Sequence, residues 1–140
     1  MPFKFIEDVA IADVAFEATG KDLNELFKSA AQAVIESMAN PKTVKPVIKK
    51  EIKKKEKDIE KLLFEFLEEI VYLKDKDAIV FHDVDVKVDE KKMELKATLR
   101  GDKIQPEKQE LHQDVKAVTM HYYLVEKKDD VWKANVVLDI

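Results

Sequence analysis

Cysteine is absent from this 140-residue chain, and glycine is nearly absent, with Gly20 and Gly101 alone. Without cysteine there is no disulfide framework and no thiolate chemistry. Two isolated glycines cannot build the glycine-rich loop that cradles phosphates in nucleotide-binding proteins. The two serines, Ser29 and Ser37, lie in a segment of helical periodicity without the sharp turn of a nucleophile elbow. The sequence therefore lacks the usual parts of a self-contained enzyme.

Hydrophobic runs long enough for a membrane are missing as well. No stretch reaches the ~20 apolar residues that a helix needs to cross a bilayer, and the N-terminus shows no signal-peptide pattern. The charge is close to balanced, with 25 basic and 29 acidic residues and a net charge of −4. We therefore expect a cytoplasmic protein with no membrane partner.

The three histidines, His82, His112 and His121, lack the paired spacing of a zinc site. His82 alternates with two valines that follow it, which predicts a position at the edge of the core. Asp83 and Asp85 then fall on the opposite face of that strand, where we expect them to be solvated.

The periodicity of apolar residues predicts two helices and several strands in a single domain over residues 1–140. Helical spacing follows Asp22 and Asp58, and each aspartate is placed to cap a helix N-terminus. Strand patterns occupy residues 3–5, 13–18, 44–52, 79–88, 93–99, 115–125 and 131–140, and an irregular polar segment is expected over 101–113. Because the helices come early and the strands late, we predict an α+β fold with two helices packed on one mostly antiparallel sheet.

The last predicted strand ends at Asp139 and Ile140, which brings a side-chain carboxylate next to an α-carboxylate. Two adjacent anionic oxygen donors are half of a site for a hard cation. A hairpin with the strand at 115–125 places Val118 opposite Asp139, within a slip of a residue or two, and Lys116 just beyond the chain end. Two interpretations stay open: a strand-end ion pair that steadies the terminus, and a cation site.

A lysine run at 49–55 also allows two interpretations. It could form a nucleic-acid patch, but no aromatic residues interleave with the lysines to stack on bases. Lysine on an edge strand also protects a sheet from edge-to-edge pairing. We favour edge protection, so that any RNA contact is indirect or weak.

Four stretches of the sequence carry a resemblance to a known family. They are DVKAVTMH at 114–121 with His112 just before it, the terminal VVLDI at 136–140, DVAFEATGKDLNELF at 13–27, and LLFEFLEEIVYL at 62–73. In this order and at these spacings they resemble the archease family over essentially the whole chain. The KAVT string and the terminal LDI are the more specific parts.

The resemblance implies a non-enzymatic protein that assists the GTP-dependent RNA ligase of tRNA splicing. It implies that the protein promotes guanylylation of the ligase's active-site histidine, allows multiple turnovers and can broaden the nucleotide that the ligase accepts. Some archeases are linked to a tRNA cytosine methyltransferase, so a chaperone-like or adaptor module for an RNA-modifying enzyme is the alternative. An independent metal-dependent hydrolase would need a general base that the sequence does not obviously supply.

The resemblance also implies which residues act. Asp13, Asp139 and the carboxylate of Ile140 match the family's ligands for a divalent cation. Calcium is the expected ion and magnesium the alternative, since oxygen-only ligation suits both. The functional cluster next to the cation is expected to comprise Lys116, His112 and His121.

One departure from the family pattern concerns the residues before Asp13. Family members carry a His-Thr-Ala run there, whereas this chain has Glu-Asp-Val-Ala-Ile-Ala over residues 7–12. Asp8 is therefore an alternative ligand to Asp13. We prefer Asp13 because the following DVAFEATG aligns without a gap.

Overall fold

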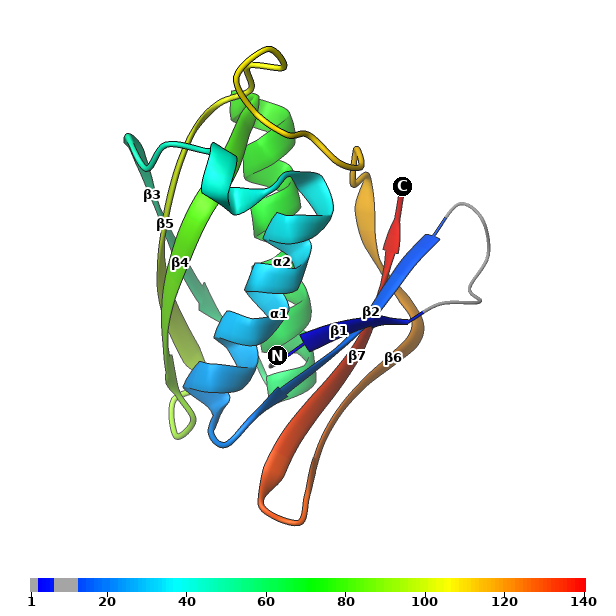
Figure 1. Cartoon of the computed structure of the whole chain (residues 1–140). Helices are drawn as coiled ribbons and strands as arrows, with labels where there is room; N and C mark the ends of the chain where they lie inside the picture. Colours follow the sequence, from blue (N-terminus) through cyan, green and yellow to red (C-terminus); the bar gives the residue numbers. More distant parts are fainter. Residues whose placement is uncertain (1–2, 7–12) are drawn as a thin grey trace.

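The computed structural model describes residues 3–6 and 13–140 (Figure 1). The described elements follow the order β1 (Phe3–Ile6), β2 (Asp13–Gly20), α1 (Leu23–Met38), a short 3-10 helix η1 (Pro41–Thr43), β3 (Ile48–Lys55), α2 (Ile59–Asp77), β4 (Ile79–Asp89), β5 (Glu94–Lys103), β6 (Ala117–Lys128) and β7 (Val131–Asp139). The predicted α+β class, with two helices and antiparallel strands, is confirmed. Neither helix of the described chain is long and apolar enough to cross a membrane.

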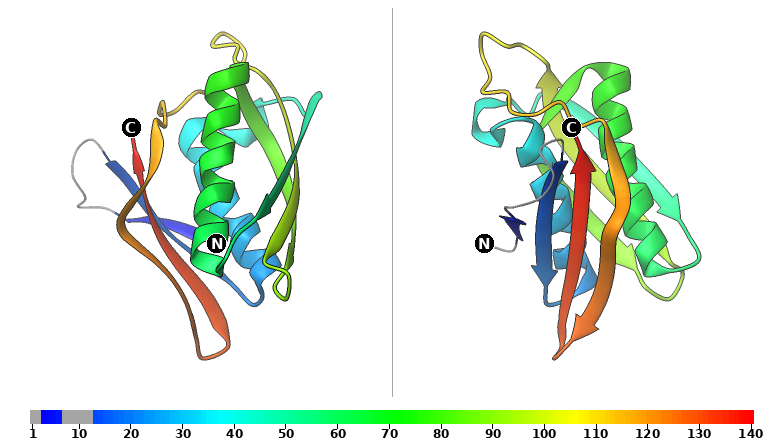
Figure 2. Two further views of the ribbon diagram at one scale, coloured as in Figure 1. Left: turned by 180° about the vertical axis from the view of Figure 1, so that it is seen from behind. Right: turned by 90° about the vertical axis from the view of Figure 1, so that its right-hand side faces the viewer.

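The strands form two sheets rather than the one expected. Their orders are β1-β2-β7-β6 and β3-β5-β4, and every neighbouring pair is antiparallel. Both helices lie between the two sheets, as the opposite views in Figures 1 and 2 show. A helix that contacts a sheet on each side needs apolar residues around most of its circumference, and α1 buries eleven of its sixteen residues.

Both predicted helix starts are confirmed. The Oδ1 atom of Asp22 accepts a hydrogen bond from the backbone N–H of Glu25 at 2.8 Å, and Asp58 does the same for Lys61 at 2.8 Å. Each aspartate thus satisfies one N–H that the first helical turn cannot bond internally. The C-terminal end of α2 is closed by Ala78, which adopts a left-handed conformation with φ of 51°.

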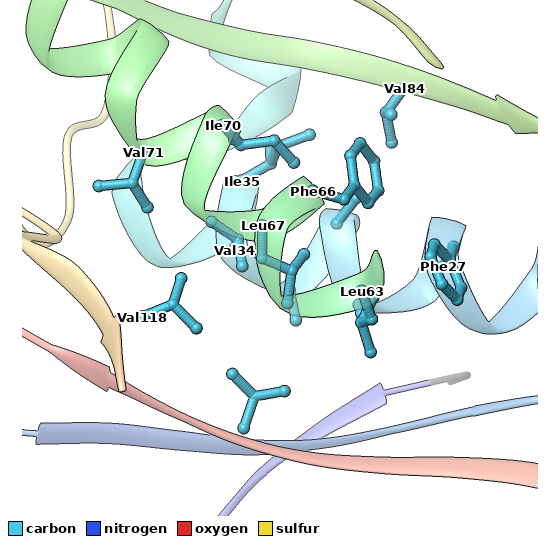
Figure 3. Packing of buried hydrophobic residues seen from close by; sticks show 14 of the residues in the cluster. Phe27, Val34, Ile35, Leu63, Phe66, Leu67, Ile70, Val71, Val84 and Val118 are labelled. Atoms are coloured by element: carbon cyan, nitrogen blue, oxygen red, sulfur yellow. The ribbon is translucent and has the colours of Figure 1, made fainter. Parts of the chain in front are cut away.

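The core fills the space between the two sheets (Figure 3). Phe27 of α1 and Phe66 of α2 stack with ring centroids 6.1 Å apart. Val84 of β4 contributes from one sheet and Val118 of β6 from the other. These side chains are almost fully buried, so they join helices and sheets into one hydrophobic cluster.

Two irregularities interrupt the ladders of the sheets. In β4 the register shifts between Phe81 and Asp83, and in β6 it shifts between Thr119 and Leu124. His82 lies at the register shift of β4 and is half-buried, as expected for a position at the edge of the core. Its Nδ1 atom lies 2.9 Å from the carbonyl oxygen of Pro41.

Two further expectations about strands need correction. Asp83 is not merely solvated, because its carboxylate lies 3.2 Å from the guanidinium of Arg100, which also lies 3.6 Å from Asp85. Strand β5 continues through Gly101 to Lys103, whereas an irregular segment was expected from residue 101. Pairing of Gly101 with Phe81 of β4 extends this strand, and such non-local pairing leaves no local sequence signal.

Candidate functional site

Strands β2 and β7 bring Asp13 directly opposite Asp139. The next pair along the ladder is Val14 and Leu138, and Leu138 is fully buried in the core. Because successive side chains of a strand point to opposite faces, the two aspartates share the face that is turned away from the helices. Both are half-buried, and Ile140 follows directly. The two side-chain carboxylates therefore lie on one face at one end of β2 and β7, the central pair of strands in their sheet.

The residues of this end fit a hard cation by their donor chemistry. Within the described part of the chain, neither Asp13 nor Asp139 takes part in an ion pair. Directly opposed carboxylates repel one another in a sheet, and an oxygen-binding cation removes that repulsion. Among residues 3–6 and 13–140, no three His, Asp or Glu side chains gather as a metal site. A third protein ligand would come from the α-carboxylate of Ile140, while Asp8 lies outside the described residues.

Lys116 reaches this end through its backbone. Its N–H donates to the carbonyl oxygen of Asp139 at 2.8 Å, and Ala117 is the residue that pairs with Asp139. Val118 faces Leu138 rather than Asp139, a slip of one residue from the expected pairing that keeps both in the core.

The side chain of Lys116 belongs to a different environment from the two aspartates. It lines a cavity of about 190 Å³ between α2 and β6, together with Glu68, Tyr72 and Asp75 of the helix. No ion pair joins Lys116 to Asp13 or Asp139 among the described residues. The backbone of Lys116 thus lies next to Asp139, while the residue lines a cavity that it shares with α2.

His112 is bound to the C-terminal end of α1. Its Nδ1 atom lies 2.7 Å from the carbonyl oxygen of Glu36, and its Nε2 atom lies 2.7 Å from the carboxylate of Glu110. Its backbone N–H donates to the carbonyl oxygen of Met38 at 2.8 Å. These contacts satisfy carbonyl groups that the last turn of a helix leaves open. The structure thus gives His112 a role in attaching the segment before β6 to the helix.

The stability of the protein is expected to depend on the charge of His112. The hydrogen bond to the Glu36 carbonyl and then the Glu110 carboxylate raise the pKa of His112 above its ordinary 6.5. The folded protein therefore binds this proton more tightly than the unfolded chain does. Its contribution is complete below about pH 6.5 and is lost as pH rises through the raised value.

Urea unfolding of the wild type and of His112→Gln between pH 5.5 and 8.5 checks this expectation. The difference in unfolding free energy should shrink with rising pH. His121→Gln is the matched control, because it removes a histidine that makes no carboxylate contact in the described chain. A difference that is constant across the range would contradict the assignment.

His121 lies on the irregular part of β6. Its backbone N–H donates to the hydroxyl of Thr119 at 3.2 Å, and its ring lies 4.3 Å from that of Tyr122. Tyr122 has a left-handed backbone with φ of 54° and is 78% exposed. A non-glycine residue in this conformation bears a small steric cost. No hydrogen bond or ion pair connects His112 or His121 with the two aspartates in the described chain.

One residue that holds the segment before β6 was missed by sequence reasoning. Lys74 of α2 is buried, and its ammonium group lies 2.7 Å from the carboxylate of Asp114 and 2.8 Å from the carbonyl oxygen of Val115. Burial alone would lower the pKa of Lys74, but hydrogen bonds to Asp114 and Asp75 outweigh it and raise the pKa. The only sequence signal is a lysine within the apolar pattern of α2, which spacing does not distinguish from a solvated one.

A groove of about 640 Å³ lies away from the aspartates, between α1 and the edge of β4. Part of the charge in this groove is paired, since Arg100 contacts Asp83 and Asp85, and Lys28 lies 3.6 Å from Asp85.

Comparison with known proteins gives one consistent family. The model of the Archease protein family (MTH1598/TM1083) matches residues 3–140. "Protein archease" of Thermococcus kodakarensis is 38% identical over 132 residues, which cover 92% of this chain and 93% of the relative. "Protein archease" of Sulfurisphaera tokodaii is 35% identical, with coverage of 99% and 98%.

Two solved structures are also similar to this chain. The solution structure of Methanobacterium thermoautotrophicum protein 1598 matches with a TM-score of 0.85 and 35% identity, covering 99% of both chains. A crystal structure from Thermotoga maritima, described as an archease and possible chaperone, matches with a TM-score of 0.69 and 25% identity. It covers 92% of this chain and 91% of its own.

Proposed function

This chain belongs to the archease family, and we propose that it is a non-enzymatic cofactor of the GTP-dependent RNA ligase of tRNA splicing. In this proposal it promotes guanylylation of the ligase, allows repeated turnover and broadens the nucleotide that the ligase accepts. The observation that carries the proposal is the direct pairing of Asp13 with Asp139 at the end of β7. In this proposal the partner ligase carries out the chemistry, and this chain assists it.

Three carboxylates would hold a divalent cation at this end: Asp13, Asp139 and Ile140. Calcium suits the site because it accepts six to eight oxygen ligands in flexible geometry, and magnesium is the alternative. Protein ligands alone would leave coordination positions for water or for a phosphate of the partner. The cation would supply positive charge where the triphosphate of GTP reacts.

Lys116 supplies the second positive group of the proposed site. Its backbone is hydrogen-bonded to Asp139 while its exposed side chain remains free to turn toward a docked partner. A lysine ammonium on a flexible stem can offset charge that develops on a phosphoryl group. His121, exposed on the irregular part of β6, is placed to contact the same partner.

Guanylylation of the ligase tests this function directly. We expect Asp139→Asn and Lys116→Gln each to reduce the stimulation of labelled-GTP transfer by more than about tenfold, because each removes a ligand or charge at the reacting group. The matched controls are Asp129→Asn and Lys128→Gln, which make the same chemical changes at the far end of the β6–β7 hairpin.

The two controls should stimulate the ligase like the wild type. Asparagine tolerates the left-handed backbone of Asp129, whose φ is 54°, so this control should not perturb the turn. Full stimulation by both site variants would rule out the proposed role of this end.

A chaperone-like or adaptor role toward an RNA-modifying enzyme, such as a tRNA cytosine methyltransferase, is the second candidate. The observation that favours it is the exposed apolar surface on the irregular part of β6, where Met120 is 61% exposed and Tyr122 is 78% exposed. Exposed aromatic and methionine side chains are typical anchors of protein interfaces. Methyltransferase binding that survives Asp139→Asn but is lost in Tyr122→Ala would support this role.

A further inference from the structure

Three lysines lie in one row across the three-stranded sheet. Lys53 of β3 is directly opposite Lys96 of β5, and Lys96 is directly opposite Lys87 of β4. We refer to these three residues as the lysine row. All three side chains are exposed, and within the described chain none of them has an ion-pair or hydrogen-bond partner.

The lysine row lies on the outer face of the sheet. Leu95 and Ala97, on either side of Lys96, are buried toward the helices, so Lys96 points the other way. Figures 1 and 2 show that neither helix covers this outer face. The three side chains are therefore open to solvent, and Lys87 and Lys96 also line a hollow of about 620 Å³ with Asp22 and Glu25 at the start of α1.

The two rows directly beside it on the same face contain acidic side chains, Glu94 and Asp89 on one side and Glu51 and Asp85 on the other. On one side Lys55 lies 3.5 Å from Glu94, and two positions along the strands on the other side Arg100 lies 3.2 Å from Asp83. Like charges that are directly opposite destabilise a sheet. The lysine row contains two such repulsive pairs, Lys53 with Lys96 and Lys96 with Lys87, in a chain whose net charge is −4. Acidic residues occupy other positions of the same face, so an opposite charge at one of these three positions would fit the composition of the face.

Protection of sheet edges does not account for the row. Lys53 and Lys87 belong to the two edge strands, where lysine prevents pairing with another chain. Lys96 belongs to the central strand β5, whose hydrogen-bonding groups are used on both sides. A lysine at this position gives no edge protection and adds repulsion to both neighbours.

We propose that the lysine row binds the phosphate backbone of a single RNA strand. Neighbouring strands of a sheet are about 4.8 Å apart, so the row spans roughly 10 Å and presents three ammonium groups in line. The outward-facing residues of the three strands are all polar, and they are Lys49, Glu51, Lys53, Lys55, Asp83, Asp85, Lys87, Asp89, Glu94, Lys96, Thr98 and Arg100. A protein partner would need aromatic or aliphatic anchors, which this face lacks, whereas phosphates need only the charges.

The chemistry of the row also defines how RNA is bound. Without aromatic side chains there is no stacking on bases, so binding is independent of sequence and sensitive to salt. Without groups that contact the 2′-hydroxyl, single-stranded DNA is bound as well as RNA. The choice of RNA as the natural strand rests on the proposed function, in which the partner ligase acts on tRNA.

The proposed RNA-binding row and the proposed cation site lie on different sheets of the protein. The lysine row belongs to the three-stranded sheet, and Asp13 and Asp139 belong to the four-stranded sheet. The two helices lie between these sheets (Figure 1). The aspartates can then face the ligase while the row holds an RNA strand on the opposite side of the protein.

Anisotropy of a labelled, unstructured RNA oligonucleotide tests the inference with the full chain. We expect the triple variant Lys53→Gln, Lys87→Gln, Lys96→Gln to bind more than about tenfold more weakly at low salt. Its slope of log affinity against log salt should be smaller by about two, since each phosphate contact contributes about 0.7 for single strands. The matched control is Lys45→Gln, Lys57→Gln, Lys108→Gln, which removes the same charge from exposed lysines elsewhere and should keep the wild-type slope.

Three results would overturn the inference. The first is equal RNA affinity of the two triple variants, and the second is an unchanged salt slope in the lysine-row variant. The third is a lysine-row variant that keeps its RNA affinity but no longer binds the ligase when RNA is absent. The thermal midpoint of the lysine-row variant should not fall, because the substitutions remove repulsion. RNA-free guanylylation should be retained by this variant and lost in Asp139→Asn, so failure of one proposal is distinguishable from failure of the other.

Discussion

Replacing Gly101 by alanine is expected to lower the free energy of unfolding by more than about 3 kcal/mol, or to prevent folding altogether. A Cβ atom at this position would collide with the carbonyl oxygen of Val80 and would lie 2.9 Å from the Cα of Phe81. Both neighbours are backbone atoms of β4, so no side-chain rotation relieves the clash. Gly101 pairs with Phe81 at the point where the register of β4 shifts, and the pairing there requires a residue without a side chain.

Urea unfolding of Gly101→Ala beside Thr98→Ala measures this effect. Thr98 belongs to the same strand β5, but it is half-exposed on the outer face of the sheet. The Thr98 variant should cost no more than about 1 kcal/mol, the span of strand propensity. Equal midpoints for the two variants would show that β4 can move away from the added methyl group and would remove the special requirement for glycine.

Local patterns in the sequence were sufficient to predict the helices and their starts. Asp22 and Asp58 act within three residues of themselves, so the cap and the helix appear in one short window of sequence. At the chain end the terminal hairpin lies within one residue of the expected register, whereas next to the loop it lies two residues away, because the register shifts between Thr119 and Leu124.

The sequence did not predict which distant strands pair with one another. Nothing in the lysine-rich strand β3 indicates that it pairs with β5, almost fifty residues later, in a second sheet. The register of β6 also shifts after Thr119, whose hydroxyl donates to the carbonyl oxygen of Val137 in the neighbouring strand at 3.1 Å. The alternation of apolar residues does not predict such an insertion.

The candidate site shows the same division. Asp139 and Ile140 are neighbours in the sequence, so the sequence alone predicted that their carboxylates lie close together. The choice of Asp13 came from resemblance to a family, and the β2–β7 register places this residue opposite Asp139. The lysine row was not foreseen, because Lys53, Lys87 and Lys96 become neighbours only when three strands pair.

The two proposed sites place opposite charges on opposite sides of the helical layer. Like-charge repulsion is tolerated in each, between Asp13 and Asp139 on one sheet and within the lysine row on the other. Each repulsion disappears when a ligand of opposite charge binds, so both sites would gain stability from their ligands. This property gives a stability measurement that does not depend on a ligase assay.

Calcium is expected to stabilise the wild type by about 2.7 kcal/mol at a hundredfold excess over its dissociation constant, and Asp13→Asn by far less. Without divalent ions the order should reverse: Asp13→Asn should be more stable by up to about 1 kcal/mol, because it removes a repulsion between directly opposed carboxylates. Urea unfolding in chelator, in calcium and in magnesium measures both effects, with Asp130→Asn as the control for loss of one surface charge.

A chain extended by three residues after Ile140 should also be stabilised only weakly by calcium, since the α-carboxylate of Ile140 is then replaced by a peptide bond. Equal stabilisation of the wild type and Asp13→Asn by calcium would contradict the cation site, whereas the reversal would tie ion binding to this one pair of residues.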